Sequence, residues 1–417
     1  MRGAKVKKVM LLGAGEGQIP FLNICKKKGC YVIAVSIKGD YPCFNLADKS
    51  YYIDTRDKAK ILEVAQMEQI DAIITDQTDV SVPSVAYVAE KMGLRGIGYE
   101  TALKFTDKYE MRKAAKEAGI CVPEFDRAYT VDEALTISER IGFPLIIKPT
   151  DGSGSRGVSK VSNREQLIKA FSEAQACSGT GAVIIEGFIQ GEEFLVDGFA
   201  MDYKYINLDL GTKEFFDIPN IFVSKMCMFA STKCPTDRVG QMVLEANKRL
   251  VNSIGLEFGI THAEYRYCQK ENKVYLIEIA ARGGGVFLSS DITPNATGFN
   301  TNEVLIDYVV DGKKTNIDEI NIDERVSAWV CFSFPDGKIV GIDGLEDLKE
   351  IDGVYKVMLN DIFLGKKVTR LKDDSGKYGP ILVVADSREE CYRVIDRVRN
   401  TFNIRIKTKN GIKNLIW

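Results

Sequence analysis

Glu264 and Glu278 are spaced like two carboxylates that meet across a β-hairpin. They lie in "THAEYRYCQKENKVYLIEIAARGGG", where two segments of alternating character flank the polar stretch "CQKENK". Their midpoint, residue 271, falls inside that stretch, so a hairpin centred there places the two side chains directly opposite each other. Because opposed like charges destabilise a sheet, we expect a raised pKa, an arginine or a divalent cation to compensate. The alternative is a solvated sheet face, which the expected burial of Ile277 and Ile279 on the other face disfavours.

An arginine and a glycine triplet follow the second glutamate. Arg282 comes four residues after Glu278 and directly before Gly283–Gly285. A cation held by two glutamates beside an arginine suits the phosphate tail of a nucleotide. By alternation His262 shares a face with Glu264, and a structural role and a substrate contact are equally open for it.

A second candidate phosphate site is the loop in "PLIIKPTDGSGSRGVSKV". Lys148 ends an apolar strand, and Ser153, Ser155 and the backbone N–H groups of residues 152–157 are able to form an anion-binding nest. The loop lacks the Gly-Lys-Ser/Thr ending of a Walker A motif, and it is predicted to join two antiparallel strands of a small lid. A plain hairpin tip is the alternative, and Arg156 is as well explained by a solvent-facing position as by a phosphate contact.

Composition limits the class of protein. The chain has 417 residues, 45% of them hydrophobic, and a formal net charge of −2, which gives no electrostatic footprint for nucleic acid or an anionic membrane. The early apolar run "VMLLGAG" is too short for a signal-peptide core or a membrane span. Ten scattered cysteines without a CxxC pair, and a single histidine, argue against a zinc site or a disulfide framework. We expect a cytoplasmic protein of several domains.

The secondary-structure elements that position these residues are also predicted from the sequence. In the first hundred residues strands alternate with helices, which predicts a parallel sheet covered on both faces. The turn after the first strand, Gly13-Ala-Gly15-Glu-Gly17-Gln18, approaches the dinucleotide motif GxGxxG, but Gln18 replaces the third glycine. A tight structural turn is therefore as well supported as a ligand role, and a nicotinamide-dependent enzyme is disfavoured.

A helix is predicted to begin near residue 106 and to lead into the lid. Its N-cap is Thr106 or Asp107, and Gly119 stops it. Lys108 lies in its first turn, where a solvated surface lysine is a better alternative than it is for Lys148. The polar stretch 312–324 has the composition of a linker, and the last ninety or so residues are rich in β-strands.

Taken in order, these segments resemble the ATP-grasp superfamily over nearly the whole chain. The resemblance implies ATP and Mg²⁺ (or Mn²⁺) as cofactors. It assigns Lys108 and Lys148 to nucleotide phosphate, Glu264 and Glu278 to the metal, and Arg282 to the transferred phosphate. The lid contacts to ATP that it implies are Ser153, Gly154 and Ser155, and the adenine and ribose contacts are Glu186, Gly187, Phe188, Ile189 and Glu193. Of the two adjacent glutamates Glu192 and Glu193, only one is able to face the ribose. His262, Gly283 and Gly284 are candidate substrate contacts beside Arg282.

The resemblance also implies the fold class and the domains. We expect an α/β chain that is α+β in its ATP-binding part. Residues 1–105 should form a Rossmann-like parallel-sheet domain, and residues 106–185 a first ATP-grasp part with a lid at about 124–185. Residues 186–312 should form a second ATP-grasp part with a central antiparallel sheet and the metal site, and residues 325–417 a β-rich α+β domain. Ala280 departs from the family's Glu-x-Asn pattern, so the metal is expected to depend on the two glutamates, phosphate oxygens and water.

The implied activity is that of a carboxylate–amine ligase that forms an acyl phosphate and releases ADP and phosphate. Among superfamily members the chain looks most similar to L-amino-acid ligases and to carbamoyl-phosphate-synthase-like single-chain proteins. An enzyme of purine biosynthesis or one that phosphorylates bicarbonate, as biotin carboxylase does, is the alternative; a non-catalytic ATP-binding module is a third. The expected partners are a small carboxylate and an amine, with a possible homodimer and no nucleic acid or membrane.

Overall fold

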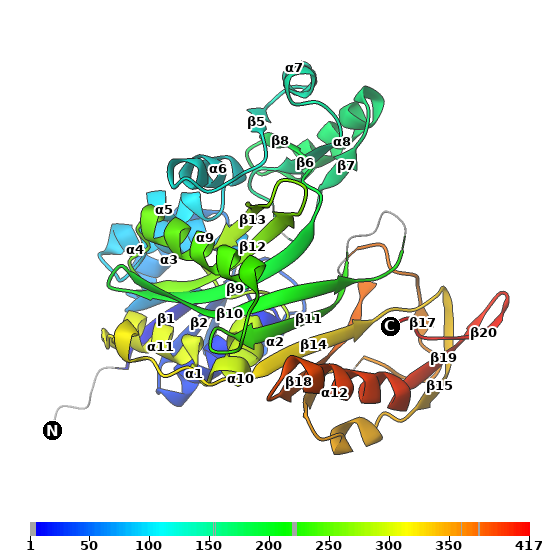
Figure 1. Ribbon diagram of the computed structural model, residues 1–417. Helices are drawn as coiled ribbons and strands as arrows, with labels where there is room; N and C mark the ends of the chain where they lie inside the picture. The colour runs from blue at the N-terminus through cyan, green and yellow to red at the C-terminus, as the bar shows by residue number, and fades with distance from the viewer. Residues whose placement is uncertain (1–5, 153, 155, 219–222, 360, 374–375) are drawn as a thin grey trace. The chain divides into compact units, whose positions relative to one another are not determined.

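The computed structural model describes residues 6–152, 154, 156–218, 223–359, 361–373 and 376–417 (Figure 1). It contains two compact units, which are described separately. The first unit comprises Met1–Asn207, Asp237–Ser290 and Asn300–Ile320, and the second comprises Leu208–Thr236, Asp291–Phe299 and Asn321–Trp417. The finer division into four domains stays a prediction. Among the described residues, no helix has the length and apolar character needed to cross a bilayer.

The N-terminal part of the first unit is a parallel sheet, as the alternating pattern predicts. Its strand order is β3-β2-β1-β4, with every pair parallel. The strands are β1 (Lys8–Leu12), β2 (Tyr31–Ser36), β3 (Lys49–Tyr52) and β4 (Ala72–Thr75), and the helices are α1 (Ile19–Lys27), α2 (Pro42–Leu46), α3 (Lys58–Glu68), α4 (Val82–Met92) and α5 (Tyr99–Lys104). The order reverses between β1 and β4, and the crevice at the carboxyl ends of such strands is where parallel sheets place ligand-binding residues.

The glycine turn after β1 is filled by the side chain of Gln18. Its Oε1 accepts a hydrogen bond from the backbone N–H of Gly15 at 2.9 Å, and its Nε2 donates to the carbonyl of Asp76 at 2.5 Å. A Cβ placed on Gly13 would lie 2.9 Å from the Gln18 side chain, so glycine is required there for packing. The turn is thus a structural link between the ends of β1 and β4, in agreement with the structural alternative.

The lid is a four-stranded antiparallel sheet of order β5-β8-β6-β7. Its strands are β5 (Phe125–Ala128), β6 (Leu145–Pro149), β7 (Ser159–Val161) and β8 (Val183–Gly187), and its helices are α7 (Val131–Ile141) and α8 (Arg164–Cys177). Figure 1 shows α7 and α8 beside this sheet. Apolar side chains of both helices pack with those of the sheet, which gives the lid a core of its own. The pairing of β6 with β7 confirms that the glycine-serine loop joins antiparallel strands.

The predicted hairpin is confirmed, with one irregularity. Strands β12 (Gly259–Cys268) and β13 (Lys273–Ala280) pair antiparallel, β12 also pairs with β9 (Glu192–Met201), and α6 (Lys108–Glu117) and α9 (Arg238–Ile254) pack on this sheet. Glu264 is the register partner of Glu278, but Tyr265 is the partner of Leu276, so Ile277 is an extra residue in a β-bulge. The expected burial of Ile277 is therefore wrong: it is half-buried, whereas Ile279 is fully buried.

The second unit is β-rich, as expected. Five strands in the order β10-β11-β14-β18-β16 are part of an eight-stranded sheet, and β10 begins in the first unit. A separate four-stranded sheet has the order β17-β15-β19-β20. The strands are β10 (Lys204–Phe215), β11 (Ser224–Ser231), β14 (Val326–Phe332), β15 (Gly337–Asp343), β16 (Val354–Val357), β17 (Lys367–Val368), β18 (Tyr378–Ala385), β19 (Asn403–Thr408) and β20 (Gly411–Asn414). The unit also contains α10 (Thr293–Thr297) and α12 (Arg388–Thr401), while α11 (Thr301–Ile306) lies in the first unit.

A buried polar network supports the strand that carries Glu264. The Tyr205 hydroxyl lies 2.7 Å from Thr261 Oγ1 on β12 and accepts a hydrogen bond from Asn247 Nδ2 at 2.8 Å. Gly198 makes room for it, because a Cβ there would lie 1.9 Å from the Tyr205 hydroxyl oxygen and 2.7 Å from the carbonyl oxygen of Ile206.

We expect Gly198→Ala to lower the free energy of unfolding by roughly 2–4 kcal/mol, because Tyr205 must leave the network. Urea unfolding measures the loss. Gly15→Ala is the matched control, since its added Cβ meets only Gln18 Oε1 at 3.4 Å and its φ is −76°. Equal stability of the two variants would contradict this role for Gly198.

Candidate active site

The paired carboxylates form the centre of the candidate site. The side chains of Glu264 and Glu278 are 29% and 31% exposed, so their oxygens reach solvent while their strands are held in the sheet. In the described part of the chain, no group of three or more His, Cys, Asp or Glu side chains is arranged to hold a metal. The two glutamates fit a Mg²⁺ ion that takes its other ligands from phosphate oxygens and water, because Mg²⁺ is commonly bound by one or two protein carboxylates.

The compensating charge next to this pair is Lys108. Its Nζ donates to Glu278 Oε1 at 3.0 Å and to the Gly152 carbonyl at 2.7 Å. Burial opposes the charged form, but the carboxylates of Glu278 and Asp79 outweigh it and raise the pKa of Lys108. Its side chain is only 5% exposed, so the alternative of a solvated surface lysine is wrong. Lys108 begins α6, and Asp107 caps that helix as predicted by accepting from two backbone N–H groups of the first turn.

Lys148, on the lid strand β6, lies in a buried cluster of charges with Glu186 on the neighbouring strand β8. Its Nζ is 2.7 Å from Glu186 Oε2, and Arg112 Nε donates to Glu186 Oε1 at 2.6 Å. Burial would raise the pKa of Glu186, but Arg112 and Lys148 together lower it to about 2. Burial lowers the pKa of Lys148, which the carboxylate of Glu186 only partly offsets. The Glu186 side chain is thus engaged by two cations, so an adenine contact at this residue would have to come from its backbone.

Arg112 was not predicted from the sequence, although it follows Lys108 by four residues on one helix face. It is fully buried, and its Nη2 donates to the carbonyl of Ile277, the bulged residue, at 2.7 Å. The backbone N–H of Ile279 approaches Met111 Sδ at 3.4 Å. Helix α6 therefore holds β13 on both sides of Glu278 and fixes where that carboxylate points.

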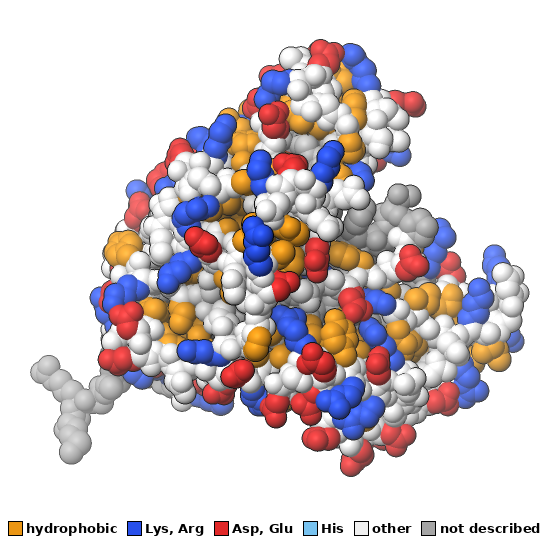
Figure 2. Space-filling view, viewed as in Figure 1, with side chains coloured by type: hydrophobic (Ala, Val, Ile, Leu, Met, Phe, Trp, Pro, Cys, Tyr) orange, Lys and Arg blue, Asp and Glu red, His pale blue; other side chains and the backbone are white. Residues whose placement is uncertain are grey.

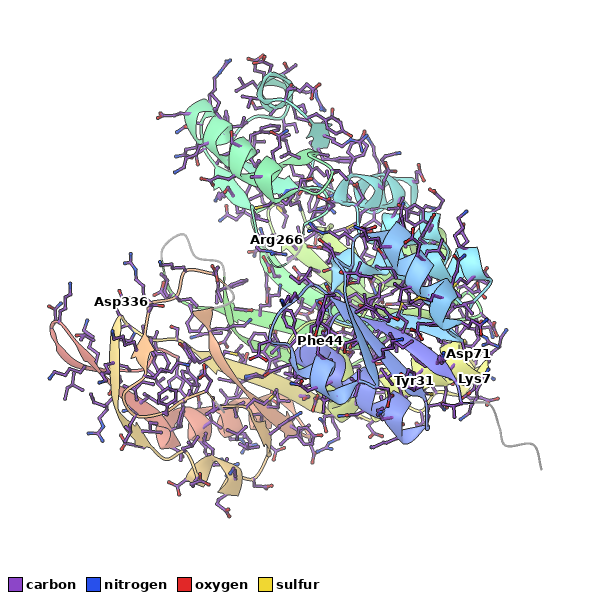
Figure 3. All side chains as sticks on the ribbon, turned by 180° about the vertical axis from the view of Figure 1, so that it is seen from behind. Lys7, Tyr31, Phe44, Asp71, Arg266 and Asp336 are labelled. Carbon is purple, nitrogen blue, oxygen red and sulfur yellow. The ribbon has the colours of Figure 1, made fainter. Side chains whose placement is uncertain are left out.

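The hinge, which is the segment that connects lid strand β8 to β9, lies next to a further ion pair. Arg266 on β12 pairs with Glu193 and donates from Nη1 to the Ile189 carbonyl at 2.8 Å (Figure 3). Lys160 Nζ lies 3.6 Å from the centre of the Phe188 ring, a cation–π contact. Glu192 is exposed and Glu193 is partly buried, which confirms that only one of the two faces inward. The adenine and ribose contacts assigned to this hinge stay predictions.

His262 is held between carboxylates on the face of Glu264. Its Nδ1 is 2.9 Å from Asp197 Oδ1, and its Nε2 is 3.9 Å from Glu264 Oε1. Burial opposes protonation, but Asp197 outweighs it and raises the pKa of His262 to about 9. Gly284 packs against the ring, since a Cβ there would lie 2.9 Å from His262 Nδ1. This geometry supplies a positive charge beside the carboxylate pair.

Arg282 is fixed by an acidic loop at the carboxyl end of β4. Its Nε and Nη2 donate to the two oxygens of Asp79 at 2.8 and 2.7 Å. Asp76, in the same loop, accepts from the Gly283 backbone N–H at 2.9 Å and from the Ser289 hydroxyl at 2.8 Å. A Cβ on Gly283 would lie 2.3 Å from the Ser289 hydroxyl and 2.4 Å from the Asp76 carboxylate, so Gly283 serves close packing.

Neither aspartate was among the sequence-based candidates. The available signal was their place in "TDQTDVS", directly after the fourth predicted strand and at the carboxyl end of a parallel sheet. In the lid loop, Ser153 and Ser155 lie outside the described residues. Gly154 is exposed with φ of +66°, and Arg156 is exposed. The loop's assignment to phosphate therefore stays a prediction.

The comparisons with known proteins agree with this architecture. Residues 141–291 match the family model described as ATP-grasp domain, and residues 330–407 match the model described as L-amino acid ligase C-terminal domain 2. Residues 141–291 of the chain thus match an ATP-grasp domain, and the second match is to a terminal domain of the kind named for L-amino acid ligases.

Curated relatives are distant and only partly aligned. Alanine–anticapsin ligase of Bacillus subtilis is 28% identical over 284 residues, which cover 64% of this chain and 59% of the relative. A formate-dependent phosphoribosylglycinamide formyltransferase of Wolinella succinogenes is 27% identical over 297 residues, with coverage of 70% and 74%. The carbamoyl phosphate synthase large chain of Archaeoglobus fulgidus is 24% identical over 315 residues, with coverage of 70% and 29%.

Solved structures show the same fold. The L-amino acid ligase of Bacillus licheniformis gives a TM-score of 0.79 at 21% identity, with coverage of 97% of this chain and 100% of that one. The phosphoribosylglycinamide synthetase of Anaerococcus prevotii gives 0.73 at 20% identity, with the same coverage. The ATP-grasp fold predicted from the sequence is thus confirmed, including the parallel N-terminal sheet and the lid.

Arg112→Met should destabilise the protein by about 3–5 kcal/mol, because Glu186 would keep only one of its two buried cations. Arg249→Met is the matched control, since Arg249 is exposed and donates only to the Gly119 carbonyl at 3.1 Å. Chemical unfolding of both variants measures the difference. If Arg112→Met loses no more free energy of unfolding than the control does, the cluster of Arg112, Lys148 and Glu186 does not stabilise the fold.

Asp76 predicts a pH dependence of stability. Burial is the main cause that raises the pKa of this carboxyl from 3.8 to about 6. Between these values the folded protein holds a proton that the unfolded chain has lost, so stability falls as the pH rises, by up to about 3 kcal/mol. We expect Asp76→Asn to lack this fall, because its amide oxygen is able to accept from Gly283 while its amide nitrogen donates to the Ser289 hydroxyl in place of the bond that Asp76 accepts. Thermal unfolding across that pH range is the measurement, and an identical decline in the variant would exclude Asp76 as its source.

Proposed function

We propose that this protein is an ATP- and Mg²⁺-dependent ligase that joins an amino acid or a similar small carboxylate to an amine. The observation that carries the proposal is the convergence of four charged groups in one place. Lys108 Nζ lies 3.0 Å from Glu278, and Glu264 faces Glu278 across the hairpin. Lys148 is buried on the lid strand β6, where, besides burial itself, the charges of Lys108 and Glu278 influence its pKa. Two lysines opposite two carboxylates suit a polyphosphate with a bound divalent cation.

In the proposed reaction, a substrate carboxylate oxygen attacks the γ-phosphorus of ATP, and the bond to the β–γ bridging oxygen breaks to release ADP. The amine then attacks the acyl carbon of the acyl phosphate, and phosphate leaves with the bonding electrons. Mg²⁺, held by Glu264 and Glu278, would supply charge neutralisation at the phosphate oxygens. Lys108, Lys148 and Arg282 position and neutralise the reactants, and electrostatic stabilisation of this kind is the main source of catalysis in phosphoryl transfer.

The support for an amino acid as the acid is the match of residues 330–407 to the model described as L-amino acid ligase C-terminal domain 2. The Arg282–Asp79 pair does not distinguish an amino acid from bicarbonate, because Nε and Nη2 of Arg282 donate to Asp79 and Nη1 donates to the Gly283 carbonyl. The relatives include a formate-dependent phosphoribosylglycinamide formyltransferase and a carbamoyl phosphate synthase large chain. A bicarbonate-dependent or purine-pathway enzyme therefore remains the alternative to test.

A non-catalytic ATP-binding module is the remaining alternative. Loss of a phosphate lysine or a metal carboxylate would favour it, but Lys108, Lys148, Glu264 and Glu278 are all present. Cytoplasmic location and a homodimer are further predictions that an activity assay does not address.

Glu278→Gln should reduce Mg-ATP-dependent phosphate release by at least about 100-fold, because it removes a metal-binding charge while keeping the size of the side chain. The variant should still fold but unfold at a lower temperature, because Lys108 loses its carboxylate partner, so phosphate release is compared at a temperature where both proteins are folded. Glu192→Gln, at an exposed position on the neighbouring strand, is the control and should keep full activity. Full activity in Glu278→Gln would refute the metal assignment.

The substrate is identified by a phosphate-release screen of single amino acids, amino-acid pairs, bicarbonate and aminosugars, followed by mass spectrometry of the product. We expect release with amino acids and a product whose mass is the sum of acid and amine less one water. Release with bicarbonate alone would favour the alternative, and release with none of them would favour a non-catalytic module.

A further inference from the structure

The C-terminal sheet of the second unit carries lysines directly opposite one another. Lys338 on β15 is the register partner of Lys407 on β19 and of Lys367 on β17. All three are exposed. Like charges at directly opposed positions destabilise a sheet. The three ammonium groups of this row therefore repel one another, and a bound anion would relieve this repulsion.

Protection of sheet edges does not explain the row. Exposed edge strands often carry lysine because it prevents pairing with other chains. In the order β17-β15-β19-β20, however, Lys338 and Lys407 lie on the two inner strands. Another reason is needed for their opposition.

The two inner lysines border a groove of about 910 Å³ whose lining lies wholly within the second unit. Its charged side chains are one aspartate, Asp336, and five cations, namely Lys338, Arg370, Lys407, Lys409 and Lys413. In the described ranges no ion pair joins any of these five to a carboxylate. Figure 2 shows Lys and Arg side chains along the β19–β20 hairpin, and Figure 3 labels Asp336 in the connection between β14 and β15.

The groove also has an apolar floor. Phe334 and Leu371 contribute to its lining and are 0% and 2% exposed, so their positions are fixed by the core of the unit. Asp336 Oδ1 accepts from the backbone N–H of Arg370 at 3.0 Å, which engages the one acidic side chain of the lining locally. The result is a cationic wall over a rigid apolar base, in a chain whose formal net charge is −2.

We propose that this groove binds a small molecule that carries several phosphate groups. Its volume lies within the roughly 300–1,000 Å³ typical of small-molecule sites. Lys338 and Lys407 lie on neighbouring strands about 4.8 Å apart, and three more cations line the same groove, which matches several linked anionic groups better than one. Lysine ammonium groups bind phosphate oxygens as point charges with three donors each. The site is separate from the residues proposed for catalysis, so the two proposals fail or succeed independently.

The test compares anion binding by the full-length protein with that of two double variants. Lys338→Gln/Lys407→Gln removes the opposed charges, and Lys233→Gln/Lys349→Gln removes two exposed lysines of the same unit outside the groove. Thermal shift and calorimetry are recorded with inorganic triphosphate and, separately, with CTP, at low salt. The inorganic probe reports phosphate groups alone, and the nucleotide adds a base and a ribose that would contact the apolar floor.

We expect the first double variant to bind at least one probe about tenfold more weakly than the wild type or worse, because two charge-assisted contacts are lost. Without a probe, it should be at least as stable as the wild type, since the opposed charges are gone. The control variant should bind as the wild type does, and both variants should retain phosphate release. Equal binding by all three proteins, or no binding of either probe to the wild type, would overturn the proposal.

Discussion

The ion pair between Lys108 and Glu278 is the interaction on which the candidate site depends. It joins the first residue of α6 to the metal-binding hairpin, and the same ammonium reaches the Gly152 carbonyl at the start of the lid loop. A buried ammonium without a partner would be strongly unfavourable, so the three segments must stay together for Lys108 to remain charged. The position of the lid base and that of the carboxylate are thereby coupled through one side chain.

Three further groups of buried charges in the first unit are also matched with opposite charges, whereas Asp76 is held by hydrogen bonds from Gly283 and Ser289. Glu186 lies between Arg112 and Lys148, Arg282 lies against Asp79, and His262 lies against Asp197. Such pairs stabilise a fold little when compared with apolar packing, because desolvation offsets most of the attraction. Their value here is placement: each holds a charged group in a low-dielectric site where water would otherwise compete for a phosphate or a carboxylate.

Much of this architecture was predictable from local patterns. The alternation of strands and helices predicted the parallel sheet, and turn composition with symmetric spacing predicted the opposition of Glu264 and Glu278, which the structure attains through the bulge at Ile277. Arg112, Asp76 and Asp79 were missed for a common physical reason. Their partners are Glu186, Gly283 and Arg282, at sequence separations of 74, 207 and 203 residues, and no local periodicity reports a contact over such distances. The burial of Lys108 was missed because the compensating Glu278 lies 170 residues away.

The bulge at Ile277 has a consequence for how the site is encoded. Near the turn, Tyr265 pairs with Leu276, and an uninterrupted ladder would continue by pairing Glu264 with Ile277 and turning Glu278 to the opposite face. One extra backbone position, whose carbonyl is bound by Arg112, returns Glu278 to the face of Glu264. The pairing of the two carboxylates thus depends on Ile277, a residue whose side chain has no polar group. A single-residue deletion in this strand would separate the two carboxylates while leaving both glutamates in the sequence.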